Sequence, residues 1–376
     1  MNRYLVMTAS IGSGHIKAAE AIARELRAAD PDAIIEVVDF MSRGVSTLHW
    51  LMKKVYLFML AFVPDLYDRC YRFSGDGVIG ALTQDAFALV MYHRMARLID
   101  AFRPDTVICT HPFPEGACAL IKRLSKRRFR LAAVLTDYSL HQIWIYPRVD
   151  DYFVAIPSMK DGLVARRFPA AAVHVTGIPV DRSVSQLPDK RTARRMLGLA
   201  EDAATVLLMG GGLGLGGIEA MLDELEGIEG RLTLLVIAGR NEDLELAIRA
   251  RIGTSRHDLH VWGFTQRALL LMQASDLLVT KPGALTVSEA FALGLPTVLH
   301  DPIPGPEEEN AIYAAEHEAS LWVHPGESLA GAVRRLLITP SLRETLARGA
   351  RSCARPSAAR DIAAVLVRER VSRSEF

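Results

Sequence analysis

The chain has 376 residues, of which 50% are hydrophobic and 23% are charged, and its formal net charge is +1 at pH 7. This composition excludes a disordered chain, and the length exceeds the ~250–300 residues at which a single hydrophobic core usually stops growing. A net charge this small gives no electrostatic attraction of the whole protein to nucleic acid. The four cysteines are scattered, so they form no disulfide or metal-binding pattern, and they suit a reducing compartment.

Short apolar runs alternate with amphipathic helical patterns along the chain, and the helical patterns include residues 18–29 and 222–226. The runs that we predict as strands are residues 4–8, 34–38, 106–109, 131–135, 152–155, 173–176, 205–209, 233–238, 259–262, 276–280 and 296–299. This alternation predicts parallel sheets with helices on both faces. This number of strands is larger than one ordinary doubly wound sheet contains, which favours two domains.

The expected domain boundary is the Gly- and Pro-containing segment 176–183. We predict an N-terminal Rossmann-like domain over residues 1–180 and a second one over 181–340. Helices over 341–376 are expected to pack across the junction of the two domains. Because ligands of open α/β sheets bind beyond the carboxyl ends of the strands, two facing domains would place the site in the cleft between them.

The sequence Ala-Ser-Ile-Gly-Ser-Gly-His at residues 9–15 follows the first predicted strand directly. It predicts a glycine turn that places His15 in the first turn of a helix. An imidazole with an ordinary pKa near ~6.5 suits a general base, and a helix N-terminus favours its neutral form. The alternative is a helix-terminal residue without chemistry. Asp137 competes for the role of base or orients His15, and His111 is expected to shape the cleft.

Two segments of the second half have the form strand, turn, helix. The first is the glycine run 210–217, and the second begins with Lys281-Pro282-Gly283 and has Thr286 and Glu289 in the helix that follows. Glycine amides at a helix N-terminus bind phosphate well, and Lys281 adds a cation. Neither segment is a Walker motif, because no Gly-Lys-Ser/Thr follows. A flexible turn and ordinary helix-start signals are the alternatives.

The second segment belongs to a longer motif. Lys-Pro-Gly-x-x-Thr-x-x-Glu-Ala starts at residue 281, Gly-Leu-Pro follows at 294–296, and Pro-Gly-x-Glu-x-x-Asn follows at 304–310. This motif resembles the nucleotide-sugar half of monogalactosyldiacylglycerol synthases and processive diacylglycerol glucosyltransferases. It is more distantly similar to the transferase that adds N-acetylglucosamine to the lipid-linked peptidoglycan precursor. The resemblance implies an α/β fold of the GT-B type, with two doubly wound Rossmann-like domains facing across a cleft.

The resemblance extends to the first half of the chain. Its motifs there are Gly-Ser-Gly-His at 12–15, Thr136-Asp137 with His141 and Trp144, and Thr-Gly-Ile-Pro at 176–179. Two positions depart from the family pattern. His141-Gln-Ile-Trp144 replaces the usual His-Pro-x-Trp, and Glu309 stands where glycine or alanine is frequent.

The resemblance also implies which residues bind the substrates. The diphosphate of a UDP-sugar would be held by Gly211, Gly212, Gly214, Lys281, Pro282, Gly283 and Thr286. Main-chain groups near Gly263 and Phe264 would bind uracil, and Glu289 would bind the ribose. Glu307 and Asn310 would bind the sugar and the nearby phosphate. On the acceptor side the implied residues are Gly14, His141 and Trp144.

A route to a lipid acceptor is expected from two further segments. Residues 46–63 have apolar side chains at helical spacing, including Trp50, Phe58 and Phe62, which fits either a core helix or a helix in the membrane interface. The run 122–130 has six cations in nine residues. It is either a solvated helix end or a site that attracts anionic headgroups at ~1 kcal/mol per residue.

The chain shows neither a signal peptide nor ~20 uninterrupted apolar residues. We therefore predict a cytoplasmic protein that is peripherally bound to the inner face of the cell membrane.

The predicted activity is inverting transfer of galactose or glucose from a UDP-sugar to diacylglycerol, with His15 and Asp137 as catalytic residues. No cofactor or obligatory metal is expected, because helix N-termini and Lys281 would stabilise the leaving diphosphate. One alternative is transfer to another lipid or small-molecule acceptor. Others are a UDP-sugar epimerase or hydrolase on the same fold, and a nucleotide-sugar-binding regulator without turnover.

Overall fold

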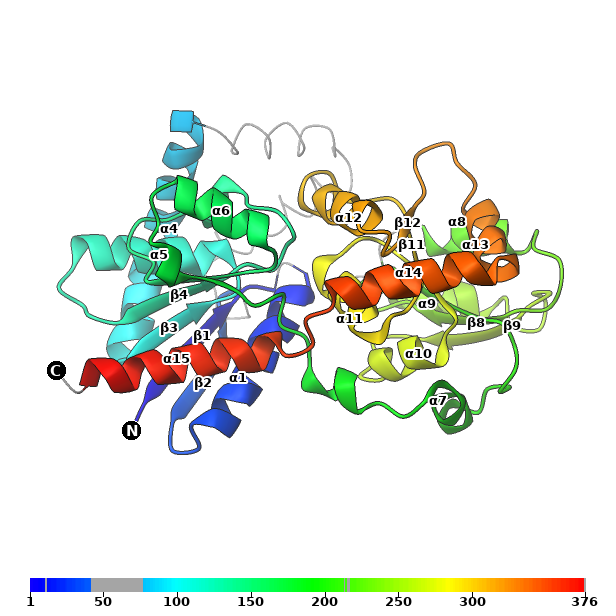
Figure 1. The fold of residues 1–376 in the computed structure, drawn as a ribbon, viewed down its shortest axis with the longest axis horizontal. Coiled ribbons are helices and arrows are strands. Elements are labelled where there is room, and N and C mark those ends of the chain that lie inside the picture. The colour runs from blue at the N-terminus through cyan, green and yellow to red at the C-terminus, as the bar shows by residue number, and fades with distance from the viewer. Residues whose placement is uncertain (11, 42–76, 213, 215–216, 375–376) are drawn as a thin grey trace. The chain divides into compact units, whose positions relative to one another are not determined.

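The computed structural model describes residues 1–10, 12–41, 77–212, 214 and 217–374. The chain divides into two compact units. The first consists of Met1–Asp181, Pro304–Pro306 and Ser357–Phe376, and the second consists of Arg182–Ile303 and Glu307–Pro356. Each unit contains a six-stranded sheet whose strand pairs are all parallel (Figure 1). Two such sheets confirm the predicted α/β fold class.

The sheet of the first unit has the strand order β2-β1-β3-β4-β5-β6. Its strands are β1 (Arg3–Thr8), β2 (Ile34–Asp39), β3 (Thr106–Cys109), β4 (Arg130–Val134), β5 (Asp151–Val154) and β6 (Val173–Val175). The central strands β3 and β4 are buried at every position. Continuous burial is typical of a parallel sheet that is covered on both faces, and it explains why these strands are apolar runs rather than alternating patterns.

Helices cover both faces of this sheet. They are α1 (Gly14–Ala29), α4 (Gly77–Phe102), α5 (Pro112–Leu124), α6 (Pro157–Ala165) and α15 (Ala358–Ser374), with short 3-10 turns at η1 (Gln142–Trp144) and η2 (Ala170–Ala172). One core packs α1 and α15 against the sheet, and another packs α4 and α5 against its opposite face. In Figure 1 the red helix α15 runs beside α1.

The C-terminal helix α15 is attached to the sheet by a buried ion pair as well as by apolar contacts. Arg130 donates to both carboxylate oxygens of Asp151, at 2.5 and 2.7 Å, and to the main-chain oxygen of Leu366 at 3.2 Å. Both side chains of the pair are less than one tenth exposed. Because an unpaired buried guanidinium is costly, this contact favours one position of α15 against β4 and β5.

The sheet of the second unit has the strand order β12-β11-β10-β7-β8-β9. Its strands are β7 (Thr205–Met209), β8 (Thr233–Ile237), β9 (Asp258–Trp262), β10 (Leu277–Thr280), β11 (Thr297–Leu299) and β12 (Leu321–Trp322). The two-residue edge strand β12 was not expected. A strand this short has no measurable alternation, so only its pairing with β11 reveals it.

The remaining helices belong largely to the second unit. They are α7 (Lys190–Leu197), α8 (Ile218–Leu225), α9 (Glu242–Arg249), α10 (Ala268–Ala274), α11 (Ala284–Leu293), α12 (Pro306–Glu316), α13 (Leu329–Ile338) and α14 (Pro340–Cys353), with a 3-10 turn at η3 (Arg182–Gln186). One core joins α8, α9 and α13 to the sheet, and another joins α10 and α11 to its other face.

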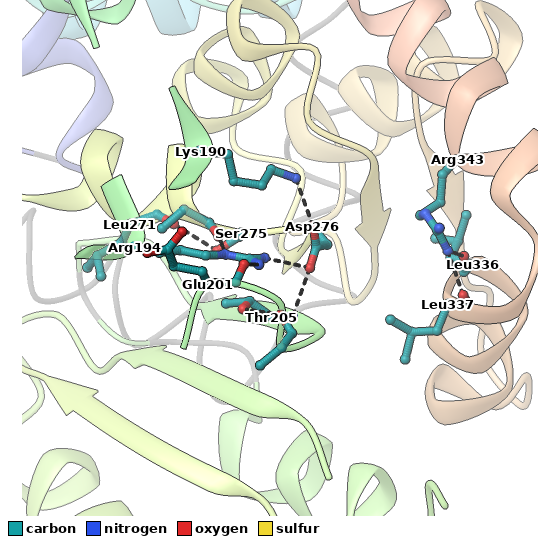
Figure 2. Close-up of polar contacts among 12 residues, drawn as sticks. Lys190, Arg194, Glu201, Thr205, Leu271, Ser275, Asp276, Leu336, Leu337 and Arg343 are labelled. Carbon is teal, nitrogen blue, oxygen red and sulfur yellow. Dashed lines mark hydrogen bonds and ion pairs between the residues drawn. The ribbon is translucent and has the colours of Figure 1, made fainter. Parts of the chain in front are cut away.

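A polar cluster stabilises the amino-terminal ends of β7 and β10, shown in Figure 2. Asp276 accepts from Lys190 at 2.8 Å, from Arg194 at 2.7 Å and from the Thr205 amide at 2.9 Å. Burial alone would raise the pKa of the Asp276 carboxyl, but these donors outweigh burial and lower it. The cluster therefore ties α7 to the sheet at the end opposite to the carboxyl edge.

Replacement of Asp276 by alanine is expected to lower the free energy of unfolding by about 2–4 kcal/mol, because the buried Arg194 side chain loses its carboxylate. A lowered folded-state pKa contributes stability above the unfolded value of ~3.9, and this contribution is lost as the pH falls through the folded value. The deficit of the variant, measured by urea unfolding at pH 7, should therefore shrink in acid. Lys190→Ala is the control, with an expected loss of about 0–1 kcal/mol, because the lysine is 44% exposed. Equal losses in the two variants would contradict the role of Asp276.

Residues 46–63, including Trp50, Phe58 and Phe62, lie outside the described residues. Within the described parts of the chain, no helix is both long and apolar enough to cross a bilayer.

Candidate active site

His15 lies at the carboxyl edge of the first sheet, in the first turn of α1. His15 follows the loop after β1. Thr110 and Thr136 follow the carboxyl ends of β3 and β4, the next two strands of the sheet. The Nδ1 atom of His15 lies 2.8 Å from the main-chain oxygen of Thr110 and 2.8 Å from the Thr136 hydroxyl. The Thr110 hydroxyl donates to the main-chain oxygen of His15 at 2.9 Å. The ring and the helix start are therefore both anchored to neighbouring strands.

These contacts define the tautomer of His15. A carbonyl oxygen only accepts hydrogen bonds, so Nδ1 must carry the proton that it donates to Thr110. The Thr136 hydroxyl then serves as a second acceptor for the same proton. The neutral ring therefore has its lone pair on Nε2, which is the atom available to take a proton.

The charge state of His15 follows from its surroundings. Burial lowers the pKa of the His15 imidazole, while the nearby carboxylate of Asp137 and the hydrogen bond to Thr110 oppose the shift without cancelling it. A lowered pKa keeps the ring neutral at pH 7, which is the form that a general base needs. The two residues that we predicted as catalytic are thus close enough to interact electrostatically.

His111 follows β3 and caps α5. Its Nδ1 accepts from the Phe113 amide at 3.2 Å, and its ring centroid lies 4.7 Å from that of His15. Burial and the neighbouring His15 hold the pKa of His111 well below its ordinary value. His111 is therefore a neutral helix cap that packs edge-on against the ring of His15.

The residues expected on the acceptor side have different surroundings. Gly14 is the first residue of α1, directly before His15, and it is half-buried. The His141 Nδ1 accepts from the Ile143 amide at 3.2 Å and caps the 3-10 turn η1. Trp144 is only 3% exposed. It occupies a packing position, and its role on the acceptor side stays a prediction.

The glycine loop after β7 is built on a close backbone approach. Gly211 and Gly214 have positive φ values of 72° and 63°, and the Gly214 amide donates to the Gly211 carbonyl at 3.1 Å. A Cβ on Gly214 would lie 2.1 Å from the Ala238 carbonyl oxygen. Gly239 faces the loop in turn, since its Cβ would lie 2.8 Å from the Gly211 oxygen. The loop therefore needs glycine on both sides, which explains part of its composition.

The loop after β10 is contacted by the two polar residues that we predicted on α12. The Asn310 amide nitrogen donates to the Pro282 carbonyl at 3.1 Å, and Asn310 is fully buried. Glu307 accepts from the Ile303 amide at 2.8 Å, and its other oxygen lies 3.8 Å from a Cβ built on Gly283. The structure thus brings the Lys-Pro-Gly turn together with Glu307 and Asn310, as their spacing of one helical turn allows.

The other predicted donor residues lie along the same carboxyl edge. Glu289 is 4% exposed and Thr286 is half-buried, both on α11. Gly263 follows β9, and its Cβ would lie 2.1 Å from a carboxylate oxygen of Glu245. Phe264 is 49% exposed, and the Arg240 guanidinium lies 4.5 Å from its ring centroid. An exposed aromatic ring beside a cation suits contact with a flat base.

The cationic run 122–130 is less basic than its sequence indicates. Lys122 pairs with Asp150, and Arg127 donates to both oxygens of Asp100 at 2.7 Å. Arg130 is the buried partner of Asp151. At least three of the six cations therefore have a carboxylate partner, which reduces the charge available for anionic headgroups.

Three contributors to these arrangements were not predicted as site residues from the sequence. They are Thr110, Arg240 and Gly239. Each follows the carboxyl end of a parallel strand, and this position is the sequence signal that could have identified them as site residues. Among the described residues, no cluster of three or more His, Cys, Asp or Glu side chains is arranged to hold a metal ion.

Comparison with known families separates the two halves of the chain. Residues 15–180 match the sequence profile of the family described as Monogalactosyldiacylglycerol (MGDG) synthase, and residues 189–352 match that of Glycosyl transferases group 1. The protein is a hexosyltransferase, similar to the MGDG synthase family over its first half and to group 1 glycosyltransferases over its second half. This confirms the predicted class of enzyme, a hexosyltransferase.

Curated relatives of the chain carry the name processive diacylglycerol beta-glucosyltransferase. The protein of that name from Bacillus licheniformis is 26% identical over 341 residues, covering 89% of this chain and 86% of the relative. Its counterpart from Bacillus subtilis is 26% identical over 343 residues, covering 89% and 87%. The relationship therefore extends over both units.

Solved structures that are similar to the chain show its fold. MurG of Acinetobacter baumannii has a TM-score of 0.63 at 16% identity, covering 98% of this chain and all of the other. The UDP-GlcNAc 2-epimerase of Neisseria meningitidis has a TM-score of 0.64 at 15% identity with the same coverage. Because transferases and epimerases share this fold, the fold alone does not separate the two activities.

Proposed function

We propose that the protein transfers a hexose from a UDP-sugar to diacylglycerol with inversion at the anomeric carbon, and that His15 is the general base. The observation that carries this proposal is that Nδ1 makes the hydrogen bonds of the His15 ring within the described residues. With Nδ1 bound to Thr110 and Thr136, Nε2 keeps the lone pair. A neutral, oriented imidazole is the group that deprotonates an alcohol at pH 7.

The proposed reaction is a single displacement. Nε2 of His15 removes the proton of the diacylglycerol hydroxyl as that oxygen attacks the anomeric carbon. The bond from this carbon to the diphosphate oxygen breaks on the opposite face, and UDP leaves. The imidazolium formed is stabilised by the two oxygen acceptors at Nδ1 and by the charge of Asp137.

The second unit is assigned the UDP-sugar. Close backbone amides in the Gly211–Gly214 turn, the N-terminus of α11 and the Lys281 ammonium would stabilise the leaving diphosphate. Glu289 would bind the ribose, and Gly263 with Phe264 would bind uracil. Glu307 and Asn310 would bind the sugar while they hold the turn that carries Lys281.

A UDP-sugar epimerase is the second candidate, supported by the similar fold of the bacterial 2-epimerase. The matches over both halves of the chain to transferase families favour transfer. The experiment is incubation of the protein with diacylglycerol vesicles and a panel of UDP-sugars. We expect one UDP released per glycosyldiacylglycerol formed, with the β-anomer obtained from an α-linked donor. A converted UDP-sugar without glycolipid would establish the epimerase instead.

We also propose that the protein acts at an anionic membrane surface and that residues 46–63 contribute to this contact. The motivation is their aromatic and apolar sequence. Phe58→Asp with Phe62→Asp should reduce cosedimentation with anionic vesicles at least about tenfold, because a charged side chain is costly in the acyl region. UDP binding serves as the control and should not change. Undiminished vesicle binding would remove residues 46–63 from the proposal.

A further inference from the structure

Three adjacent strands of the second unit end level with one another at the carboxyl edge. Thr280 of β10 pairs with Met209 of β7 on one side and with Leu299 of β11 on the other. Lys281 is the first residue beyond β10, and His300 is the first residue beyond β11. The His300 amide donates to the Thr280 carbonyl at 3.2 Å. Lys281 and His300 therefore leave neighbouring strands at the same edge.

The side chain of His300 is buried with one ring nitrogen unused. His300 is 4% exposed, and no atom of the described chain hydrogen-bonds to its Nε2. Its Nδ1 lies 3.2 Å from a carboxylate oxygen of Asp301, whose side chain is 72% exposed. Buried polar side-chain atoms without a partner are uncommon in folded proteins and call for an explanation, such as a bound ion or water.

The protonation of the ring follows from its neighbours. A carboxylate only accepts hydrogen bonds, so Nδ1 carries a proton and the neutral ring has its lone pair on Nε2. Burial lowers the pKa of the His300 imidazole, and the positive charge of Lys281 lowers it further. The carboxylates of Asp301 and Glu224 act in the opposite direction without cancelling the shift. In the unliganded protein His300 is therefore neutral beside a lysine cation.

We propose that His300 is a second cationic ligand of the donor's diphosphate, and that its Nε2 takes up a proton from solvent when UDP binds. The proposal rests on the proposed function, which places the diphosphate beside Lys281. A multiply charged anion there reverses the local field, so that the imidazolium becomes the favoured form. Nε2 then donates to a phosphate oxygen, and no covalent bond of UDP is made or broken.

Asp301 is the partner that makes this exchange possible. Its carboxylate lies 3.2 Å from Nδ1 of the ring, and its negative charge favours the imidazolium. Its backbone has a positive φ of 40°, a conformation that residues other than glycine seldom adopt. Because Nε2 is covered in the unliganded chain, its contact with phosphate requires the His300 ring to turn about its side-chain bonds. The strained residue beside it is where the backbone is expected to adjust.

The test is calorimetric titration of the full chain with UDP and with uridine at pH 7.5, in two buffers of different ionisation enthalpy. The unchanged protein should take up a fraction of a proton per UDP and none per uridine. His300→Asn should abolish this uptake and weaken UDP binding about 10- to 100-fold, the range for a lost charge-assisted hydrogen bond. Binding of uridine should not change.

Two further variants test whether the effect of His300→Asn comes from a folding defect. Asp301→Asn alters an exposed side chain and suits a positive φ, so it should fold normally and still reduce the proton uptake. His317→Asn is the matched control, because His317 is exposed in the turn directly after α12, and its side chain contacts Tyr313 within the described chain. It should leave both proton uptake and UDP affinity unchanged.

Proton uptake that persists in His300→Asn, or equal losses of UDP and uridine binding, would overturn the inference. These results leave the proposed transfer intact, because transfer is measured as glycolipid formed by the unchanged protein. Absence of glycolipid together with His300-dependent proton uptake would instead reject the transfer and keep the ligand assignment.

Discussion

Replacement of His15 by alanine is expected to lower the rate of hexose transfer about 10²- to 10⁴-fold, while UDP affinity stays within about twofold of the unchanged protein. The general base is lost, but the donor residues of the second unit are untouched. The measurements are release of UDP in the presence of diacylglycerol vesicles and calorimetric titration with UDP. His317→Ala, at an exposed position directly after α12, is the control and should keep full activity.

A companion variant separates the roles of His15 and Asp137. The Asp137 carboxylate raises the pKa of His15, so Asp137→Asn should lower it further. Activity that depends on neutral His15 falls in acid, so the acid limb of kcat/KM should lie below ~6.5 and move to lower pH in the variant. If Asp137 is the base, Asp137→Asn would instead abolish the reaction as completely as His15→Ala.

Replacement of Gly214 by alanine is expected to lower UDP affinity at least about tenfold and the free energy of unfolding by about 2–4 kcal/mol. The added Cβ would lie 2.1 Å from the Ala238 carbonyl oxygen, and the backbone there has a positive φ of 63°. Because the clashing atom belongs to the main chain of Ala238, it cannot move away as the end of a flexible side chain could. The glycine loop must therefore shift, and its amides no longer point at the diphosphate. Urea unfolding and UDP titration measure the two effects.

Gly230→Ala is the matched control for Gly214→Ala. Gly230 also has a positive φ, 87°, but no heavy atom lies within 4 Å of its added Cβ. It should cost about 1–2 kcal/mol of stability through backbone strain alone and leave UDP affinity unchanged. Similar UDP affinities in the two variants would show that the Gly214 loop does not bind the nucleotide.

Much of the fold was predictable because most strands are buried apolar runs. The strands β3 and β7 have the bounds that the sequence predicted, Thr106–Cys109 and Thr205–Met209. The other predicted strands differ by one residue at one end, and β4 and β5 differ by one residue at both ends, where hydrophobicity does not mark the last hydrogen bond. The edge strand β12, with two residues, could not be predicted, since its identity depends on pairing with β11.

Site residues were predictable to the extent that a motif ties them together in sequence. The Lys-Pro-Gly turn, Glu307 and Asn310 form one motif, and their contact in the structure involves local segments. Trp144 shows the limit of this reasoning. A tryptophan in a motif gives no sign of its exposure, and here the residue is buried.

The sequence alone determined the class of fold, the order of the strands along the chain and the residue types that sugar transfer requires, because periodicity and local motifs are properties of neighbours in the chain. Tertiary structure alone decided which nitrogen of His15 is free, since Thr110 and Thr136 lie 95 and 121 residues away. It also decided that His300 is buried with Nε2 unpartnered within the described chain and near Lys281. Hydrogen bonding, burial and charge act through space, and strand order in the sheet decides which distant residues meet.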